Sequence, residues 1–215
     1  MADHHHIDIY CERLGPEFWA EPVNAVTNAA FLVAALFAFL SARRDPNSDI
    51  GVYALVVLIA AIGIGSFLFH TYAVTWAKYA DVIPIMLFKL GFLWIYSRSK
   101  IGWSTVQTGG LIIVFVLLNL LSGFIPYHWF NGSQGYAAAL IFLIGFAVHQ
   151  YRNETGPQRF LLAGAAGVFC LSLTFRSLDM ALCDMIPLGV HFLWHILNAV
   201  VLYLCVRSLI KPKTA

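Results

Sequence analysis

Charged residues are scarce in this chain. Of its 215 residues only 11% are Asp, Glu, Lys or Arg, whereas 60% are hydrophobic. A soluble domain has about 25% charged and about 45–50% apolar residues. The apolar excess is too large for one buried core, so the composition predicts a membrane protein that uses lipid as its solvent.

Clusters of basic residues and internal repeats are also missing. The formal net charge is only +2 and the basic residues are scattered, so we expect no nucleic-acid partner. The N-terminal residues are acidic, and no basic segment precedes an apolar one, so we expect no signal peptide. There is no internal repeat or low-complexity stretch. We therefore expect a single domain over residues 1–215, in which residues 1–22 form an acidic N-terminal segment.

The apolar residues form long continuous runs separated by short polar loops. A membrane-spanning helix needs about 20 apolar residues, and a continuous run favours a helix over the alternating strand of a membrane barrel. The sequence therefore predicts an all-α membrane protein with a bundle of transmembrane helices. The expected seven spans are residues 23–42, 52–72, 79–97, 104–123, 134–151, 160–180 and 187–209.

The basic residues outside the spans lie mostly on one side of the predicted membrane. The loops after the first, third and fifth spans and the C-terminal segment contain Arg43, Arg44, Arg98, Lys100, Arg152, Arg159, Arg207, Lys211 and Lys213. The other side has only Arg13 and Lys78. The excess of basic residues in cytoplasmic loops predicts a cytoplasmic C-terminus and an N-terminus outside. Lys89 lies deep in the third span, and the sequence identifies no partner for it.

Polar side chains inside the spans gather near the outer ends of three helices. Ser66 and His70 end the second span, Asp81 opens the third, and His191 and His195 open the last. Residues four apart share one face of a helix. Because ionisable groups inside a membrane are costly, they indicate a functional site.

Three helices can bring these three imidazoles to the same depth. Three neutral histidines with one open position are a known catalytic zinc arrangement, and zinc lowers the pKa of a bound water to about 7. Asp81 is the candidate for accepting the proton of that water. Taken singly, each histidine could instead be an interhelical hydrogen-bond partner and Ser66 a small packing residue. Their common depth favours the metal site.

Two further features lie on the outer side. Asp8, Glu12 and Glu21 crowd into the N-terminal segment, and such carboxylates are candidate calcium ligands. Carboxylates also suit a helix N-terminus without any metal, so both interpretations stay open. Cys11 and Cys183 both fall on this side, where an oxidising compartment would allow a disulfide between them.

A charged pair of opposite sign lies at the outer end of the sixth span. Arg176 and Asp179 are three residues apart on one helix. This spacing predicts a structural ion pair.

The polar pattern resembles the alkaline ceramidase family, which belongs to a seven-helix hydrolase superfamily with the adiponectin receptors and lipid-remodelling proteins of the GPI pathway. The resemblance covers nearly the whole chain. The motifs that support it are Ser66-x-x-x-His70, Asp81, His191-x-x-x-His195, Tyr10-Cys11-Glu12, the stretch from Glu21 to Asn28, and Asp179-x-x-x-Cys183.

The resemblance implies zinc-dependent hydrolysis of a lipid amide, ceramide or ceramide-like, to a fatty acid and a long-chain base. The implied zinc ligands are His70, His191 and His195, the implied acid/base is Asp81, and Ser66 is implied to hold the substrate carbonyl or its oxyanion. It also implies a calcium ion on the acids of the N-terminal segment.

The chain departs from the family pattern in that segment. Tyr10 stands where the family tends to have tryptophan, Asp8 lies one residue further away, and the interval from Glu12 to Glu21 is short. The calcium ligands therefore stay open. The compact loops suit a bacterial member in the inner membrane with its site facing outward, where the substrate could be another lipid amide or an ester.

Two other functions are compatible with the same residues. One is a lipid-sensing, receptor-like protein with a structural zinc, although the short C-terminal tail offers little surface and we expect no protein partner. The other is a proton or ion transporter, although the ionisable residues cluster on the outer side and His149 is the only candidate within a span toward the inner side.

Overall fold

The computed structural model describes residues 6–210, and all regular structure in that range is helical. The helices are α1 (Pro22–Thr27), α2 (Ala29–Ala42), α3 (Ile50–Tyr72), α4 (Thr75–Tyr96), α5 (Thr105–Ser122), α6 (Ala137–Asn153), α7 (Leu161–Leu178) and α8 (His191–Leu209). The short turns of helix are η1 (Ser97–Ile101), η2 (Tyr127–Trp129), η3 (Ser133–Tyr136), η4 (Gly156–Phe160) and η5 (Met180–Leu182). Because α1 and α2 continue one another, the bundle has seven main helices.

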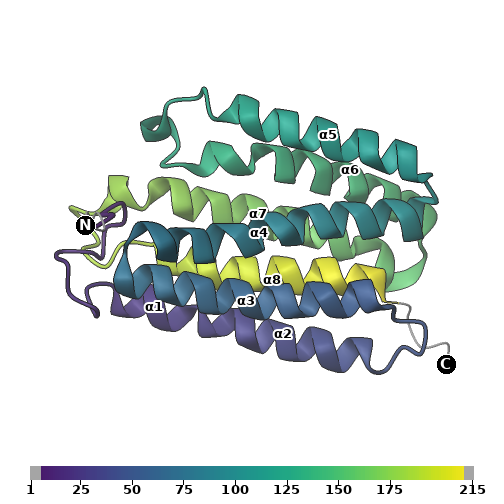
Figure 1. Cartoon of the computed structure of the whole chain (residues 1–215), viewed down its shortest axis with the longest axis horizontal. Coiled ribbons are helices and arrows are strands. Elements are labelled where there is room, and N and C mark those ends of the chain that lie inside the picture. The colour runs from purple at the N-terminus through teal and green to yellow at the C-terminus, as the bar shows by residue number, and fades with distance from the viewer. Residues whose placement is uncertain (1–5, 211–215) are drawn as a thin grey trace.

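The seven helices form a closed ring. They lie lengthwise beside one another (Figure 1), and from α2 onward each packs against the next helix in the chain. The last helix, α8, contacts α2 as well as α7 and so closes the ring. This closure brings the N-terminal segment and the start of α8 to the same end of the bundle.

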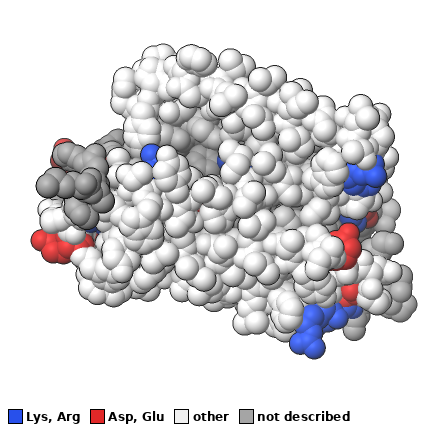
Figure 2. Space-filling view, in the orientation of Figure 1, with Lys and Arg blue, Asp and Glu red and all other residues white. Residues whose placement is uncertain are grey.

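Six of the seven helices are long and apolar enough to cross a membrane: Pro22–Ala42, Ile50–Tyr72, Thr75–Ile101, Thr105–Ser122, Gly156–Leu178 and His191–Leu209. The remaining helix, α6, has 17 residues. In Figure 2 the charged side chains lie at the two ends of the long axis, and the middle of this face is almost free of them. The predicted all-helical, seven-helix bundle of an integral membrane protein is thus confirmed in its helix content.

Some helix boundaries differ from the expected ones. The third span was expected from residue 79, where the continuous apolar run begins. The structure has α4 beginning at Thr75, and its first turn contains the polar residues Thr75 and Lys78, which interrupt the apolar pattern. The last span was expected from residue 187, but α8 begins at His191. Gly189 has a φ of +68°, a left-handed conformation that glycine adopts without strain, and it ends the preceding loop.

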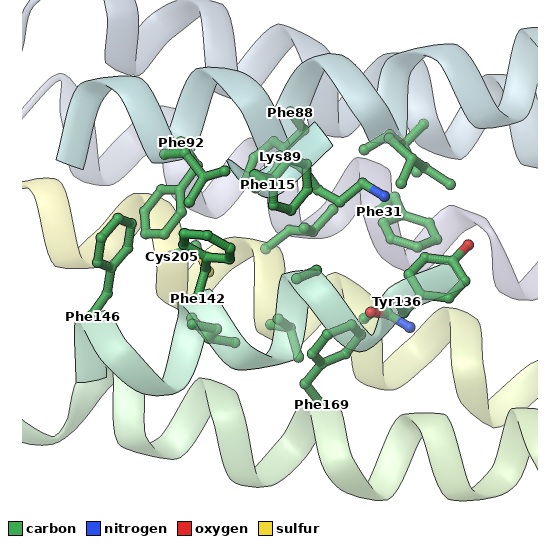
Figure 3. A pocket seen from close by; sticks show the side chains of 18 of the residues that line it. Phe31, Phe88, Lys89, Phe92, Phe115, Tyr136, Phe142, Phe146, Phe169 and Cys205 are labelled. Atoms are coloured by element: carbon green, nitrogen blue, oxygen red, sulfur yellow. The ribbon is translucent and has the colours of Figure 1, made fainter. Parts of the chain in front are cut away.

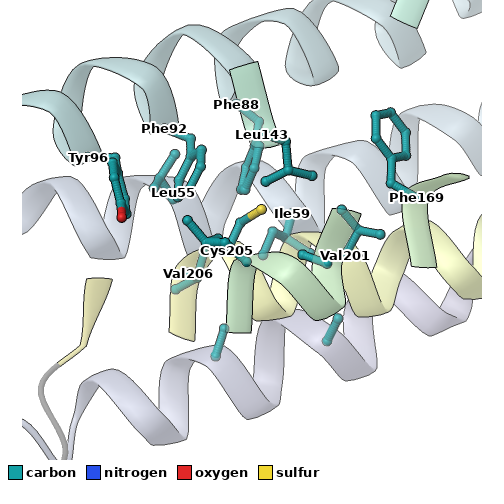
Figure 4. Close-up of a cluster of buried hydrophobic side chains, with 14 of the residues drawn as sticks. Leu55, Ile59, Phe88, Phe92, Tyr96, Leu143, Phe169, Val201, Cys205 and Val206 are labelled. Carbon is teal, nitrogen blue, oxygen red and sulfur yellow. The ribbon is translucent and has the colours of Figure 1, made fainter. Parts of the chain in front are cut away.

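The buried apolar core includes side chains from all seven main helices. Leu55 and Ile59 from α3 meet Phe88 and Phe92 from α4 and Val206 from α8 (Figure 4). In a membrane, lipid is as apolar as these side chains, so close packing rather than removal from water holds the helices together. This packing fixes the three helices that also carry the predicted site.

The structure contains the predicted disulfide between Cys11 and Cys183. It connects the N-terminal segment to the loop between α7 and α8. The segment is therefore attached beside the first turn of α8.

Candidate metal centre

Three histidines meet at one end of the bundle. His70 lies in the last turn of α3, and His191 and His195 lie in the first two turns of α8. One ring nitrogen from each lies within 4.8 Å of the others, and each side chain is only 1% exposed. Within residues 6–210 this is the one cluster of three or more His, Cys, Asp or Glu residues with such spacing.

Two ring nitrogens of these histidines have a hydrogen-bond partner, and two others have none among residues 6–210. His70 Nδ1 is 2.6 Å from Glu21 Oε2, and His195 Nδ1 is 3.0 Å from the Thr27 hydroxyl. His195 Nε2 and His191 Nδ1 are buried and have no hydrogen-bond partner in the part of the chain that the structure describes. A buried polar atom without a partner is costly, and histidine ligands characteristically hold their second nitrogen in such a hydrogen bond. The three residues could therefore hold a metal ion.

Asp81 and Ser66 lie beside this cluster. Asp81, in the second turn of α4, interacts electrostatically with His70 and Arg176, and its carboxyl is within hydrogen-bonding reach of the Ser66 hydroxyl. One of its oxygens, Oδ1, is buried and has no hydrogen-bond partner. A carboxylate so placed can accept a proton from a group in the site.

Gly65 allows α3 and α4 to approach closely at this point. A Cβ added at Gly65 would overlap with the backbone carbonyl of Ala80 and would lie 3.0 Å from the amide nitrogen of Asp81. These are backbone atoms, which cannot rotate away. The contact between the two helices therefore depends on the absence of a side chain here.

Replacing Gly65 with alanine is expected to push α4 away from α3 and to separate Asp81 from Ser66. Overpacking of this kind costs about 1–3 kcal/mol. The variant should unfold at a lower temperature than the unaltered protein in detergent. The matched control is Gly167→Ala on α7, where an added Cβ meets no atom within 4 Å. Equal effects of the two changes would contradict this account.

The prediction of an ion pair between Arg176 and Asp179 is wrong. Asp179 is 1% exposed, and its carboxylate accepts hydrogen bonds from backbone N–H groups. The donors are Cys11 at 3.0 Å, Val190 at 2.7 Å and His191 at 2.9 Å. A carboxylate is favoured at the positive N-terminal end of a helix. Asp179 therefore anchors the start of α8, and with it the backbone of His191.

Arg176 points instead toward Tyr10, another contact that the sequence analysis missed. Its Nη1 donates a hydrogen bond of 3.1 Å to the Tyr10 hydroxyl, and the Tyr10 ring stacks on His191 with 3.8 Å between the ring centres. Burial raises the pKa of Tyr10 above its usual range, so this hydroxyl stays protonated at neutral pH. No periodicity could have predicted contacts between residues so far apart in the chain.

The three acids predicted to bind calcium have other contacts. Glu12 accepts hydrogen bonds of 2.7 and 2.8 Å from the backbone N–H groups of Val23 and Asn24 at the start of α1. Burial raises the pKa of Glu12, although these two donors oppose the shift. Glu21 contacts a histidine and an arginine, and Asp8 is exposed. Within residues 6–210 these three carboxylates do not form a group close enough to hold one ion, so their contacts give the predicted calcium site no support.

An apolar pocket adjoins the histidines. All seven main helices contribute to its wall. Trp194 and Asn198, which flank His195 on α8, are among the lining residues and connect the pocket to the cluster. Figure 2 shows that this face of the molecule is hollowed between α4 and the α5–α6 pair. None of the three histidines lines the pocket, so it lies next to the cluster and reaches it through Trp194 and Asn198.

Lys89 is the one basic residue among the side chains that line the pocket. Its nitrogen points toward the Tyr136 end of the pocket (Figure 3). It lies 5.2 Å from the centre of the Tyr136 ring and 5.9 Å from that of Phe115. Among residues 6–210 it makes no hydrogen bond or ion pair within the usual distance limits. Aromatic faces attract a cation at this range. The partners of Lys89 that the sequence did not identify are therefore these two aromatic rings.

Comparison with known proteins gives one positive finding. The family model named Ceramidase matches residues 10–211, which is nearly the whole chain. The search of curated proteins found no match. The matched range contains the three histidines, Ser66 and Asp81.

Proposed function

Since the chain belongs to the ceramidase family, we propose that it is a zinc-dependent hydrolase that cleaves the amide bond of ceramide or a ceramide-like lipid within the membrane. The observation that supports this most directly is the set of three buried imidazoles beside an apolar pocket, two of them with nitrogens that have no partner. The products would be a fatty acid and a long-chain base.

Each residue of the site has a proposed task. His70, His191 and His195 would hold the zinc, and a bound zinc ion supplies Lewis-acid activation of water and of a carbonyl group. Asp81 takes the proton from the attacking water and returns it to the leaving amine. Ser66 donates a hydrogen bond to the substrate carbonyl oxygen as it gains negative charge.

The histidine orientations support this assignment. Glu21 and Thr27 hold the Nδ1 atoms of His70 and His195, so that the Nε2 atoms of both rings are available to a metal. Such outer contacts of metal-binding histidines fix the ring and its tautomer. The two residues that orient the histidines are thus Glu21, which precedes α1, and Thr27, which ends it.

The pocket supports a lipid substrate. Its wall is almost entirely aromatic and aliphatic, and it lies inside helices with the length and composition of membrane spans. An acyl chain in this pocket would place its amide next to the histidines. The basic loops favour a cytoplasmic C-terminus, so we propose that the site faces the outer side of a bacterial inner membrane.

The test is to measure zinc and hydrolysis on the same purified protein. We expect about one zinc per chain by elemental mass spectrometry, and release of fatty acid from ceramides or related lipid amides by lipid mass spectrometry, with ester analogues tested beside them. Zinc and lipid binding without turnover would replace this proposal with a lipid-sensing function. Absence of zinc after a chelator-free preparation, together with pH-dependent flux in vesicles, would replace it with transport.

A further inference from the structure

Arg13 is a buried cation of the N-terminal segment. Arg13 is 3% exposed. Its guanidinium makes three polar contacts. Nε lies 2.5 Å from Glu21 Oε1, Nη1 donates to the Gly15 carbonyl at 3.0 Å, and Nη2 donates to the His70 carbonyl at 2.9 Å. The positive charge is thus surrounded by one carboxylate and two carbonyl oxygens.

Carboxylate and carbonyl oxygens are also the ligands that calcium takes in proteins. Here their common neighbour is the guanidinium, whose donors form a rigid fork that suits such oxygens. A calcium ion at the same place would lie against the fixed positive charge of Arg13. We propose that Arg13 is the built-in cation of this site, that it takes the place of a calcium ion, and that the protein works without calcium.

The same contacts make Arg13 a positioning residue for the metal centre. Glu21 bridges the Arg13 guanidinium and the Nδ1 of His70, with distances of 2.5 and 2.6 Å. Arg13 also holds the backbone carbonyl of His70 near the end of α3. Arg13 therefore acts on the backbone of a proposed zinc ligand directly and on its ring through Glu21.

The first test uses the unaltered protein in detergent, with calcium chloride or the chelator EGTA added. We expect the unfolding temperature to be the same in both, and elemental mass spectrometry to find no stoichiometric calcium. A calcium-dependent rise of the unfolding temperature, or one bound calcium per chain, would overturn the proposal. This test needs no variant and does not depend on the proposed hydrolase function.

The second test removes the cation. Arg13→Ala leaves the oxygens of Glu21, Gly15 and His70 facing one another, so calcium chloride should raise the unfolding temperature of this variant while leaving that of the unaltered protein unchanged. The double variant Arg13→Ala, Glu21→Gln should lose this response. If calcium does not stabilise Arg13→Ala, the oxygens are not a cation site and the proposal fails.

A third readout concerns zinc, and this one rests on the proposed metal site. Loss of an outer contact of a metal ligand weakens metal affinity by about 10- to 100-fold, so Arg13→Ala should lose zinc to a competing chelator at a correspondingly lower chelator concentration. Arg13→Lys should recover part of this affinity, because it restores the charge without the fork. Arg44→Ala, at an exposed arginine near the end of α2, is the control and should keep normal affinity. Unchanged zinc affinity in Arg13→Ala would refute the positioning role.

Discussion

His195→Ala is expected to remove both the zinc and the activity. The His195 ring is buried, one nitrogen is held by Thr27, and the other has no hydrogen-bond partner among residues 6–210. Alanine leaves two histidines, which cannot complete the three-ligand site. Because the loss of an outer contact alone weakens binding or activity by about 10- to 100-fold, the loss of a direct ligand should have a larger effect.

The measurement is zinc per chain by elemental mass spectrometry, together with the rate of fatty-acid release from the best lipid amide. His128→Ala is the matched control, because His128 is exposed in the loop between α5 and α6. It should keep both zinc and activity. A His195→Ala protein with a full complement of zinc would show that the metal, if present, is held elsewhere.

The central site was predictable because it depends on helix periodicity and on depth in the membrane. The four-residue spacing places His191 and His195 on one face of α8, and Ser66 and His70 on one face of α3. The alternation of inner and outer ends then brings α3, α4 and α8 together at one level. The first rule acts within a single helix and the second needs only the order of the spans, so a sequence is sufficient to apply both.

The surroundings of the site were not predictable in the same way. Cys11 and Asp179 are hydrogen-bonded although they are separated by 168 positions in the chain. The spacing of Arg176 and Asp179 predicted a pair, but it makes two residues neighbours only while the helix continues. Asp179 lies just after the end of α7, and its side chain turns to the start of α8.

The burial of Arg13 could not be predicted from the sequence either. Its place in an acidic segment on the outer side gave no sign of burial, and the nearby carboxylates indicated calcium. The partner of a carboxylate in an irregular segment depends on how the loop folds back, which no short-range rule describes. A buried arginine and a bound calcium satisfy the same oxygens, so only the folded structure separates the two.

Asp81→Asn is expected to keep the zinc and lose the activity. Asparagine has the size and shape of aspartate, but it cannot accept a proton from the attacking water. General acid–base catalysis contributes about 10²- to 10⁴-fold to a rate, and the variant should lose activity by that order. The zinc should remain, because the three proposed ligands are histidines and Asp81 is not among them.

The combination of the two readouts distinguishes the possible roles of Asp81. Zinc content by elemental mass spectrometry and fatty-acid release should be measured on Asp81→Asn beside Asp184→Asn, a control at an exposed acid in the loop between α7 and α8. If Asp81→Asn hydrolyses its substrate at the normal rate, the carboxylate is not the acid/base. If it loses the zinc as well as the activity, Asp81 helps to hold the metal. Only retained zinc with lost activity assigns it the movement of the proton, because the amide leaves shape and metal intact and removes that one capacity.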